Sequence, residues 1–226
     1  TYTIPKANVT TSLNNTYYYC TVVQTYGEST ETVNSAVAGL SVISKASITG
    51  QPASMQVIAG KTEVTYTVNV TGSGTLVYQW YKNTSNSTSG GQKITGAVGN
   101  TYTISAGNVT TSLNNTYYYC VVTQTYGSST KTATSGTAQL TVIAGVTIKT
   151  QPTAQSVYES KPASFTVAVN GGGTITYQWY SNSSNSTSGG SPISGQTNAT
   201  YTIPSATSDL NLSLIHISEP TRLQLI

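Results

Sequence analysis

The stretch "NVTTSLNNTYYYC" at residues 8–20 occurs a second time, letter for letter, at residues 108–120. Cys20 and Cys120 end the two copies, so the copies are 100 residues apart. A fixed spacing of this kind is typical of structural units placed in series along one chain. The sequence therefore predicts repeats of about 100 residues.

The repetition extends well beyond these thirteen residues. "TYTIPKA" begins at Thr1, "TYTISAG" at Thr101 and "TYTIPSA" at Thr200. Upstream of the last two, "LVYQWYKNTSNSTSGG" at 76–91 matches "ITYQWYSNSSNSTSGG" at 175–190. The alignment predicts the rear part of one repeat at 1–45, a whole repeat at 46–145 and the front part of a third at 146–211.

Apolar and polar residues alternate inside the whole repeat. Tyr66, Val68 and Val70 are separated by threonine and asparagine, and the same period of two runs through "LVYQWY" at 76–81 and "TAQLTVI" at 137–143. This alternation is typical of strands with one buried face, and segments such as "STSGG" at 87–91 supply the turns between them. About seven short strands per repeat predict an all-β fold of the sandwich type.

The predicted strands resemble those of an immunoglobulin-like domain. Tyr118 stands two residues before Cys120, as the tyrosine-corner residue does in that family. The segments that carry the resemblance are "TEVTYTVNVTG" for strand B, "YQWY" with Trp80 for strand C, "TYTI" for E, "YYYCVV" for F and "TAQLTV" for G. The pattern is most similar to the immunoglobulin-like modules of bacterial surface proteins and adhesins. The resemblance implies tandem immunoglobulin-like β-sandwiches, with strands E–G in 1–45 and strands A–E in 146–211.

The cysteines depart from the family pattern. Val68 and Val167 stand where the family has its strand B cysteine, so no disulfide is expected within a repeat. Cys20 and Cys120 would lie in strand F of different sandwiches, too far apart to pair. We expect both to be buried free thiols. A missing bridge costs about 2–5 kcal/mol, which a core of this size tolerates.

The C-terminal segment shares neither period nor composition with the repeats. "LSLIHISEPTR" at 212–222 holds the single histidine, His216, and the single arginine, Arg222. It resembles the translation of a sequencing adapter, so residues 212–226 are expected to be an adapter-derived tail without a functional role. The alternative is a genuine amphipathic tail.

Composition and charge narrow the classes of partner. Charged residues make up 7% of the chain and the net charge is +3, with no run of lysine or arginine that would neutralise consecutive phosphates. Nucleic acid is not an expected partner. No stretch approaches the roughly 20 apolar residues of a membrane helix. The hydroxyl- and amide-rich surface suits an extracellular protein, either secreted or on a bacterial cell surface, and we expect the chain to be an internal piece of something longer.

The whole repeat has few groups that could carry catalysis. Glu63 is its single carboxylate, and it has no histidine. Acid–base pairs, catalytic triads and metal clusters need more such groups than the repeat contains. We therefore expect no enzyme activity, no metal and no cofactor.

The candidate binding residues are aromatic. If Tyr118, Cys120 and Val122 face inward, Tyr117 and Tyr119 face outward, and Tyr81 joins them from strand C. Three outward tyrosines would form a patch of the kind that binds sugars or proteins. The alternative is that they are cross-strand pairs that stabilise an exposed sheet.

The joins between repeats suggest a mechanical role. "LSVISKASITGQP" at 40–52 and "LTVIAGVTIKTQP" at 140–152 pass from one repeat to the next without a spacer rich in glycine, serine or proline. The leading hypothesis is a stalk of a bacterial adhesin, whose partners are the neighbouring repeats. The alternatives are a weak multivalent module that binds a host protein or glycan, and an accessory domain of a secreted hydrolase.

The two part-repeats are predicted to be complementary. The first would supply strands F and G, and the second would lack them and leave Trp179 uncovered. We expect chains to associate head to tail through these parts, and residues 46–145 alone to form a stable monomer.

Overall fold

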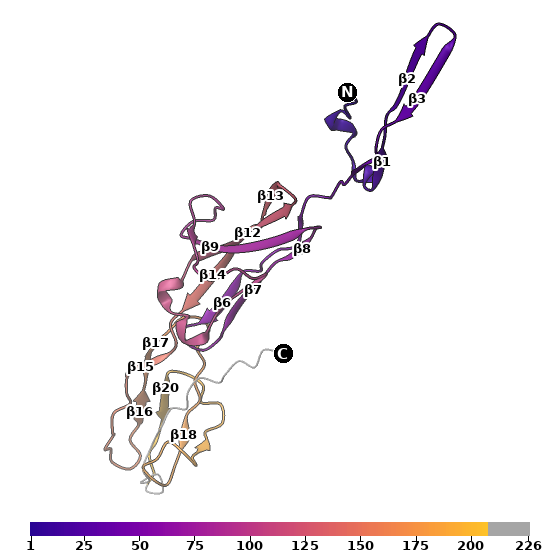
Figure 1. Cartoon of the computed structure of the whole chain (residues 1–226). Helices are drawn as coiled ribbons and strands as arrows, with labels where there is room; N and C mark the ends of the chain where they lie inside the picture. The colour runs from indigo at the N-terminus through magenta and orange to yellow at the C-terminus, as the bar shows by residue number, and fades with distance from the viewer. Residues whose placement is uncertain (208–226) are drawn as a thin grey trace. The chain divides into compact units, whose positions relative to one another are not determined.

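A computed structural model describes residues 1–207 (Figure 1). The predicted tail at 212–226 lies outside the described residues. Helix within 1–207 is confined to single 3-10 turns, as the absence of helical periodicity predicts. These turns are η1 (Lys6–Asn8), η2 (Thr11–Leu13), η3 (Ala106–Asn108) and η4 (Thr111–Leu113).

Short strands make up the rest of the regular structure. In the predicted first part-repeat they are β1 (Thr16–Tyr18), β2 (Thr21–Tyr26), β3 (Ser29–Asn34) and β4 (Ala38–Leu40). In the central repeat they are β5 (Ser47–Gly50), β6 (Met55–Ile58), β7 (Val64–Thr67), β8 (Asn69–Thr71), β9 (Thr75–Asn83), β10 (Gln92–Lys93), β11 (Thr101–Ile104), β12 (Thr116–Tyr126), β13 (Ser129–Thr134) and β14 (Ala138–Ile143). In the third they are β15 (Thr147–Thr150), β16 (Ala163–Thr166), β17 (Ala168–Asn170), β18 (Tyr180–Ser181), β19 (Ser191–Pro192) and β20 (Thr200–Ile203).

The chain divides into two compact units by its internal contacts. The first holds residues 1–54, 65–103 and 116–139, and the second holds 55–64, 104–115 and the described residues from 140 onward. The border between these units passes through the predicted central repeat. The repeat boundaries at 45, 145 and 211 thus stay a prediction.

The pairing of the strands gives an immunoglobulin-like β-sandwich. One sheet has the order β10-β9-β12-β14-β6, with β13 also paired to β12. Strand β6 pairs with β14 in parallel, whereas β9 and β13 both run antiparallel to β12. The opposing ladders are β11-β7 and β5-β8. This all-β arrangement recurs in series along the chain, so the fold is that of tandem immunoglobulin-like sandwiches, as the sequence predicts.

An aromatic cluster fills the space between the two layers. Tyr66 of β7 stacks on Tyr118 of β12 with 4.8 Å between ring centroids, and Trp80 of β9 lies 6.2 Å from Tyr66. All three are buried, together with Val68 and Cys120. Cys120 is a free thiol, as predicted, and valine occupies the position that would hold its disulfide partner.

The first part-repeat differs from its central copy. Thr1–Ile4 form no strand, although the matching "TYTI" segments form β11 and β20. Each of those strands pairs with a strand of the β7 type, β7 or β16, and residues 1–45 contain no such strand. The expectation of a strand E at 1–4 is therefore wrong.

Cys20 is also exposed, which contradicts the expectation that both thiols are buried. In the central repeat β9 pairs along β12 and places Trp80 opposite Cys120. Among the described residues β1 pairs only with β4, and β2 only with β3. Residues 1–45 contain no strand of the β9 type beside Cys20 and none of the β7 type opposite it, so its thiol faces solvent.

Trp179 is 1% exposed, so the expectation of an uncovered tryptophan in the third part-repeat is wrong. It belongs to a core cluster with Phe165, Val167 and Ile203, and Tyr201 packs 6.0 Å from its ring. The indole Nε1 donates to the carbonyl of Asn198 at 2.8 Å. Strands of the A–E type therefore form a local core around this residue.

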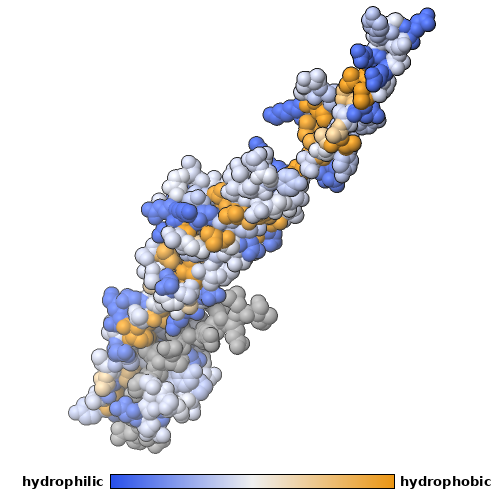
Figure 2. Space-filling view, in the orientation of Figure 1, coloured by the Kyte–Doolittle hydropathy of each residue, from blue (hydrophilic) through white to orange (hydrophobic). Residues whose placement is uncertain are grey.

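The surface is mostly polar, in keeping with the composition. Figure 2 shows white and blue residues over most of the visible face, with hydrophobic residues in separate patches. Exposed valines are frequent in the first part-repeat, namely Val9, Val22, Val23, Val33 and Val37. Their exposure is the main departure from an ordinary sandwich.

Candidate functional site

Strands β9 and β12 bring the three predicted tyrosines onto one face of the sheet. The register pairs Tyr119 with Tyr81, and Tyr117 with Asn83. Because side chains alternate along a strand, these residues share the face opposite Trp80 and Cys120. The rings of Tyr81 and Tyr119 lie parallel, 5.2 Å between centroids and 9° between planes. Tyr81, Tyr117 and Tyr119 therefore lie on the sheet face that points away from the core.

Tyr119 is nevertheless 3% exposed, so the expectation that it faces solvent is wrong. The chain at Gly91 packs against the end of its ring, where a Cβ atom would lie 2.6 Å from the phenol oxygen. Tyr81 and Tyr117 are half-buried. The accessible aromatic surface is thus smaller than that of three exposed tyrosines. The parallel rings of Tyr81 and Tyr119 fit the alternative that these residues form a cross-strand pair that stabilises the sheet.

Polar side chains fix the loop beside this face. Asn83 Nδ2 donates to the carbonyls of Ser87 and Ser89, at 2.9 and 3.0 Å. Asn182 makes the same two bonds to Ser186 and Ser188 in the third part-repeat. The loop at 83–91, "NTSNSTSGG", is therefore held by its first residue, Asn83, and the loop at 182–190 is held by Asn182. The sequence signal for this loop is an asparagine six residues before a serine in both copies, Asn83 before Ser89 and Asn182 before Ser188.

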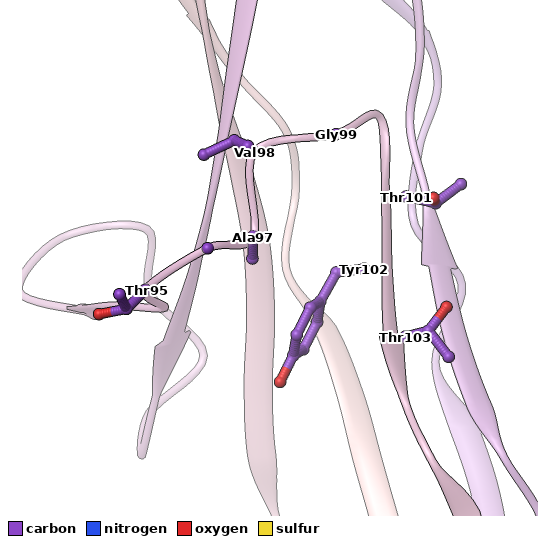
Figure 3. Close-up of a pocket in the computed structure, with 8 residues that line it drawn as sticks. Thr95, Ala97, Val98, Gly99, Thr101, Tyr102 and Thr103 are labelled. Carbon is purple, nitrogen blue, oxygen red and sulfur yellow. The ribbon is translucent and has the colours of Figure 1, made fainter.

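A shallow pocket of about 430 Å³ is lined in part by Tyr102, whose ring lies 5.8 Å from that of Tyr118. Figure 3 shows Tyr102 between the 95–99 segment and the segment that carries Thr101 and Thr103. Burial raises the pKa of the Tyr102 phenol. Hydroxyls and backbone line this pocket, so it offers weak hydrogen bonding and no charged group.

Acid–base chemistry has little support among residues 1–207. Within that range no group of three or more histidine, cysteine, aspartate or glutamate residues is placed to hold a metal ion. Burial raises the pKa of the Cys120 thiol to about 11, although a backbone hydrogen bond from Gln79 opposes this shift. The thiol is protonated near neutral pH and is a poor nucleophile.

Sequence reasoning missed the buried amide of Gln124. Its Oε1 accepts from the backbone N of Ala46 at 2.7 Å, and its Nε2 donates to the carbonyls of Ser44 and Ser73 at 3.0 and 2.7 Å. Gln124 therefore fastens residues 44–46, where the chain enters the central repeat, to the end of β12. The recurrence of "QTYG" at 24–27 and 124–127 was the available signal.

Comparison with known proteins adds structural neighbours only. No family model matches the sequence, and no curated protein matches it. A fragment of the titin I-band is 14% identical, covering 91% of this chain and 68% of that one, with a TM-score of 0.48. Extracellular domains 3–5 of Drosophila OTK are 17% identical, covering 90% of this chain and 65% of that one, with a TM-score of 0.45. Immunoglobulin domains 1–4 of Sidekick-1 are 21% identical, covering 76% of this chain and 45% of that one, with a TM-score of 0.44.

The chain spans less than two thirds of the length of the first solved structures that it matches, from 36% to 65%. Likeness of this degree carries no conclusion about ligand or partner, and the assignment of the fold rests on strand order and register. No helix among residues 1–207 is long and apolar enough to cross a membrane.

Proposed function

We propose that the chain is a stalk or spacer module of a bacterial cell-surface or secreted repeat protein of the adhesin type. The observation that carries this proposal is the packing where β14 leads into β15. A Cβ atom added at Gly172 would lie 3.1 Å from Ile143 Cβ, and one added at Gly171 would lie 3.0 Å from Val146 Cα. The glycine turn at 171–173 thus fits directly against residues 143–146.

Two further features support a stiff connection. Gln124 holds the entry segment 44–46 with two hydrogen bonds, to Ala46 and Ser44, and makes a third to Ser73. The exit segment between β14 and β15 is only residues 144–146. Short joins with specific contacts restrict the motion of neighbouring repeats, whereas Gly/Ser-rich joins behave as flexible coils.

The test is the distribution of distances across the join. Dyes on Gln56→Cys and Ser194→Cys, two exposed positions, in a Cys20→Ser background report it by single-molecule energy transfer at concentrations where the chain is monomeric. We expect a narrow distribution. The matched control carries Gly-Ser-Gly-Ser inserted after Ala144 and should give a broad one. If the unaltered chain is as broad as the control, the stalk proposal fails.

The second candidate is a weak multivalent module that binds a glycan or a host protein. The same binding role would suit an accessory domain of a secreted hydrolase. Half-exposed Tyr81 and Tyr117 on one sheet face support it. Binding on a glycan and matrix-protein array should fall for Tyr81→Ala or Tyr117→Ala but not for Tyr126→Ala, which alters an exposed tyrosine at the end of β12. An array without such binding removes this candidate.

A further inference from the structure

Strands β3 and β13 each leave one edge of a β-hairpin open (Figure 1). Within residues 1–207, β13 pairs with β12 alone and β3 with β2 alone, while β5 approaches β13 but pairs with β8. Residues 29–34 are all exposed, and in 129–134 only Ala133 is partly covered. The sheet that contains β13 also contains β6, β9 and β14, so the open edge is a property of the complete sheet.

The hydrogen-bond pattern shows which backbone groups point to this edge. Ser135 N–H donates to the carbonyl of Cys120 at 2.9 Å. Ser35 N–H donates to that of Cys20 at 2.8 Å. Hydrogen-bonded and non-hydrogen-bonded pairs alternate along an antiparallel ladder. The registers of both hairpins therefore turn the N–H and C=O groups of the even-numbered residues to the open edge, namely Thr130, Thr132 and Thr134 in β13 and Thr30, Thr32 and Asn34 in β3.

One position of this edge reverses its charge between the copies. Glu31 lies near the middle of β3, and Lys131 lies at the same place in β13. Both side chains are exposed. Pairing of β13 with another β13 would bring two lysines close together, and a charge of one sign protects an edge strand in this way. The opposite sign at Glu31 makes β3 and β13 complementary to each other instead.

We propose that β3 of one chain and β13 of a second copy pair edge to edge as antiparallel strands, with Glu31 opposite Lys131. The residues whose backbone groups face the two open edges then lie opposite one another, Thr130 with Thr32 and Thr132 with Thr30. Glu31 and Lys131 form a non-hydrogen-bonded pair, the kind in which facing side chains lie closest. Main-chain hydrogen bonds supply the affinity, and the ion pair selects this register over one shifted by two residues.

The same geometry places the two charges on one face of the joined sheet. Glu31 is paired with Gln24 in its hairpin, and Lys131 is paired with Gln124. Paired residues of antiparallel strands point to the same face. Rotation of one hairpin by half a turn about an axis perpendicular to the sheet makes the edges antiparallel and keeps that face on the same side. Because hairpins of this kind recur along the chain, several weak contacts between two molecules add avidity.

Charge reversal in the full chain tests the register. Glu31→Lys and Lys131→Glu each place like charges opposite one another, and we expect each to weaken association about 5–10-fold in low salt. The double variant restores a complementary pair and should associate within about twofold of the wild type. All the replaced side chains are exposed, so the circular dichroism spectra should not change. Sedimentation equilibrium at rising concentration measures the association, which added salt should weaken in the wild type.

A second pair of variants tests the main-chain contact. Thr132→Pro removes an N–H that faces the open edge and that β12 does not use, so the hairpin should stay intact. We expect it to weaken association at least about tenfold, because a hydrogen bond is lost and the proline ring meets the added strand. Thr132→Val is the matched control, which keeps the N–H and the branched side chain and should change association by less than about threefold.

The outcomes separate this pairing from other ways of associating. Association that none of these variants changes, or a double charge variant no tighter than the single ones, overturns the proposal. Equal effects of Thr132→Pro and Thr132→Val also contradict it. A wild-type chain that stays monomeric up to about 1 mM overturns it as well, and the charges would then serve only to protect the edges. If Thr132→Pro fails to fold, the charge series still decides.

Discussion

At the residue scale, the two cysteines have the same neighbours in sequence and opposite environments. The backbone N–H of each cysteine donates to a serine Oγ at 2.9 Å, that of Ser35 for Cys20 and that of Ser135 for Cys120. Cys120 is buried and Cys20 is exposed. Thiol reactivity should therefore separate the two copies.

We expect a thiol reagent to label Cys20 rapidly in dilute native protein and Cys120 only on unfolding. A domain stabilised by 5 kcal/mol or more opens rarely enough to slow labelling of Cys120 by at least about a thousandfold. Mass spectrometry of digested samples measures each site, with Cys20→Ser as the control. Comparable rates at the two sites would contradict the burial of Cys120 between the two layers of the central repeat.

The Tyr66 hydroxyl is buried and has no hydrogen-bond partner among the described residues. The third part-repeat has Phe165 at the matching position. We expect Tyr66→Phe to stabilise the central repeat by about 1 kcal/mol, because an unsatisfied buried hydroxyl is removed. The reverse exchange, Phe165→Tyr, should destabilise by a similar amount. Urea unfolding measures both, and loss of stability in Tyr66→Phe would mean that the hydroxyl is satisfied.

Burial raises the pKa of Cys120 to about 11, and it also raises the pKa values of Tyr66 and Tyr118. Below pH 9 the thiol is protonated in both the folded and the unfolded state, so it adds no pH dependence. Between pH 9 and 11 the unfolded state loses its proton first, and the free energy of unfolding should fall as pH rises. Urea titrations across this window should show a shallower fall for Cys120→Ala. An unchanged slope would indicate that the thiol ionises freely.

At the element scale, Gln124 connects β12 to two other segments. Gln124 is buried and its side-chain amide makes hydrogen bonds to residues 44, 46 and 73, whereas Gln24, at the same place in the first copy, is exposed. The same residue therefore has a structural role in one copy only.

Gln124→Ala should destabilise the central repeat by about 2–3 kcal/mol, because it leaves buried backbone groups unpaired. Gln24→Ala is the matched control, and it should change stability by less than about 0.5 kcal/mol. Chemical unfolding followed by tryptophan fluorescence measures the difference. Equal effects of the two substitutions would show that the entry segment 44–46 does not depend on the amide.

At the scale of the whole molecule, the predicted repeat boundaries can be tested directly. We expect residues 46–145 alone to be monomeric and to unfold in one cooperative transition, because they contain both sheets and the aromatic cluster. Sedimentation and urea unfolding check this. If that segment does not fold, the central repeat depends on contacts such as that of Ile143 with Gly172, which lie beyond residue 145.

The sequence by itself determined the local structure of the repeat. Both copies of "NVTTSLNNTYYYC" form the same pair of 3-10 turns, and Asn15 and Asn115 both adopt a positive φ, 64° and 60°. Alternation also identified the inward side chains of β7, β9, β12 and β14, because a period of two assigns each residue to a sheet face regardless of what covers it.

Only the tertiary structure decided which of those faces is covered. "TYTI" forms a strand at 101–104 and at 200–203 but not at 1–4, and Tyr119 is buried where Tyr19 is 64% exposed. The difference lies in β7 and β9, partners distant in sequence that the first copy lacks in this chain. A strand's hydrogen bonds and a side chain's burial are completed by neighbours from elsewhere in the fold, so identical residues take different environments when those neighbours differ.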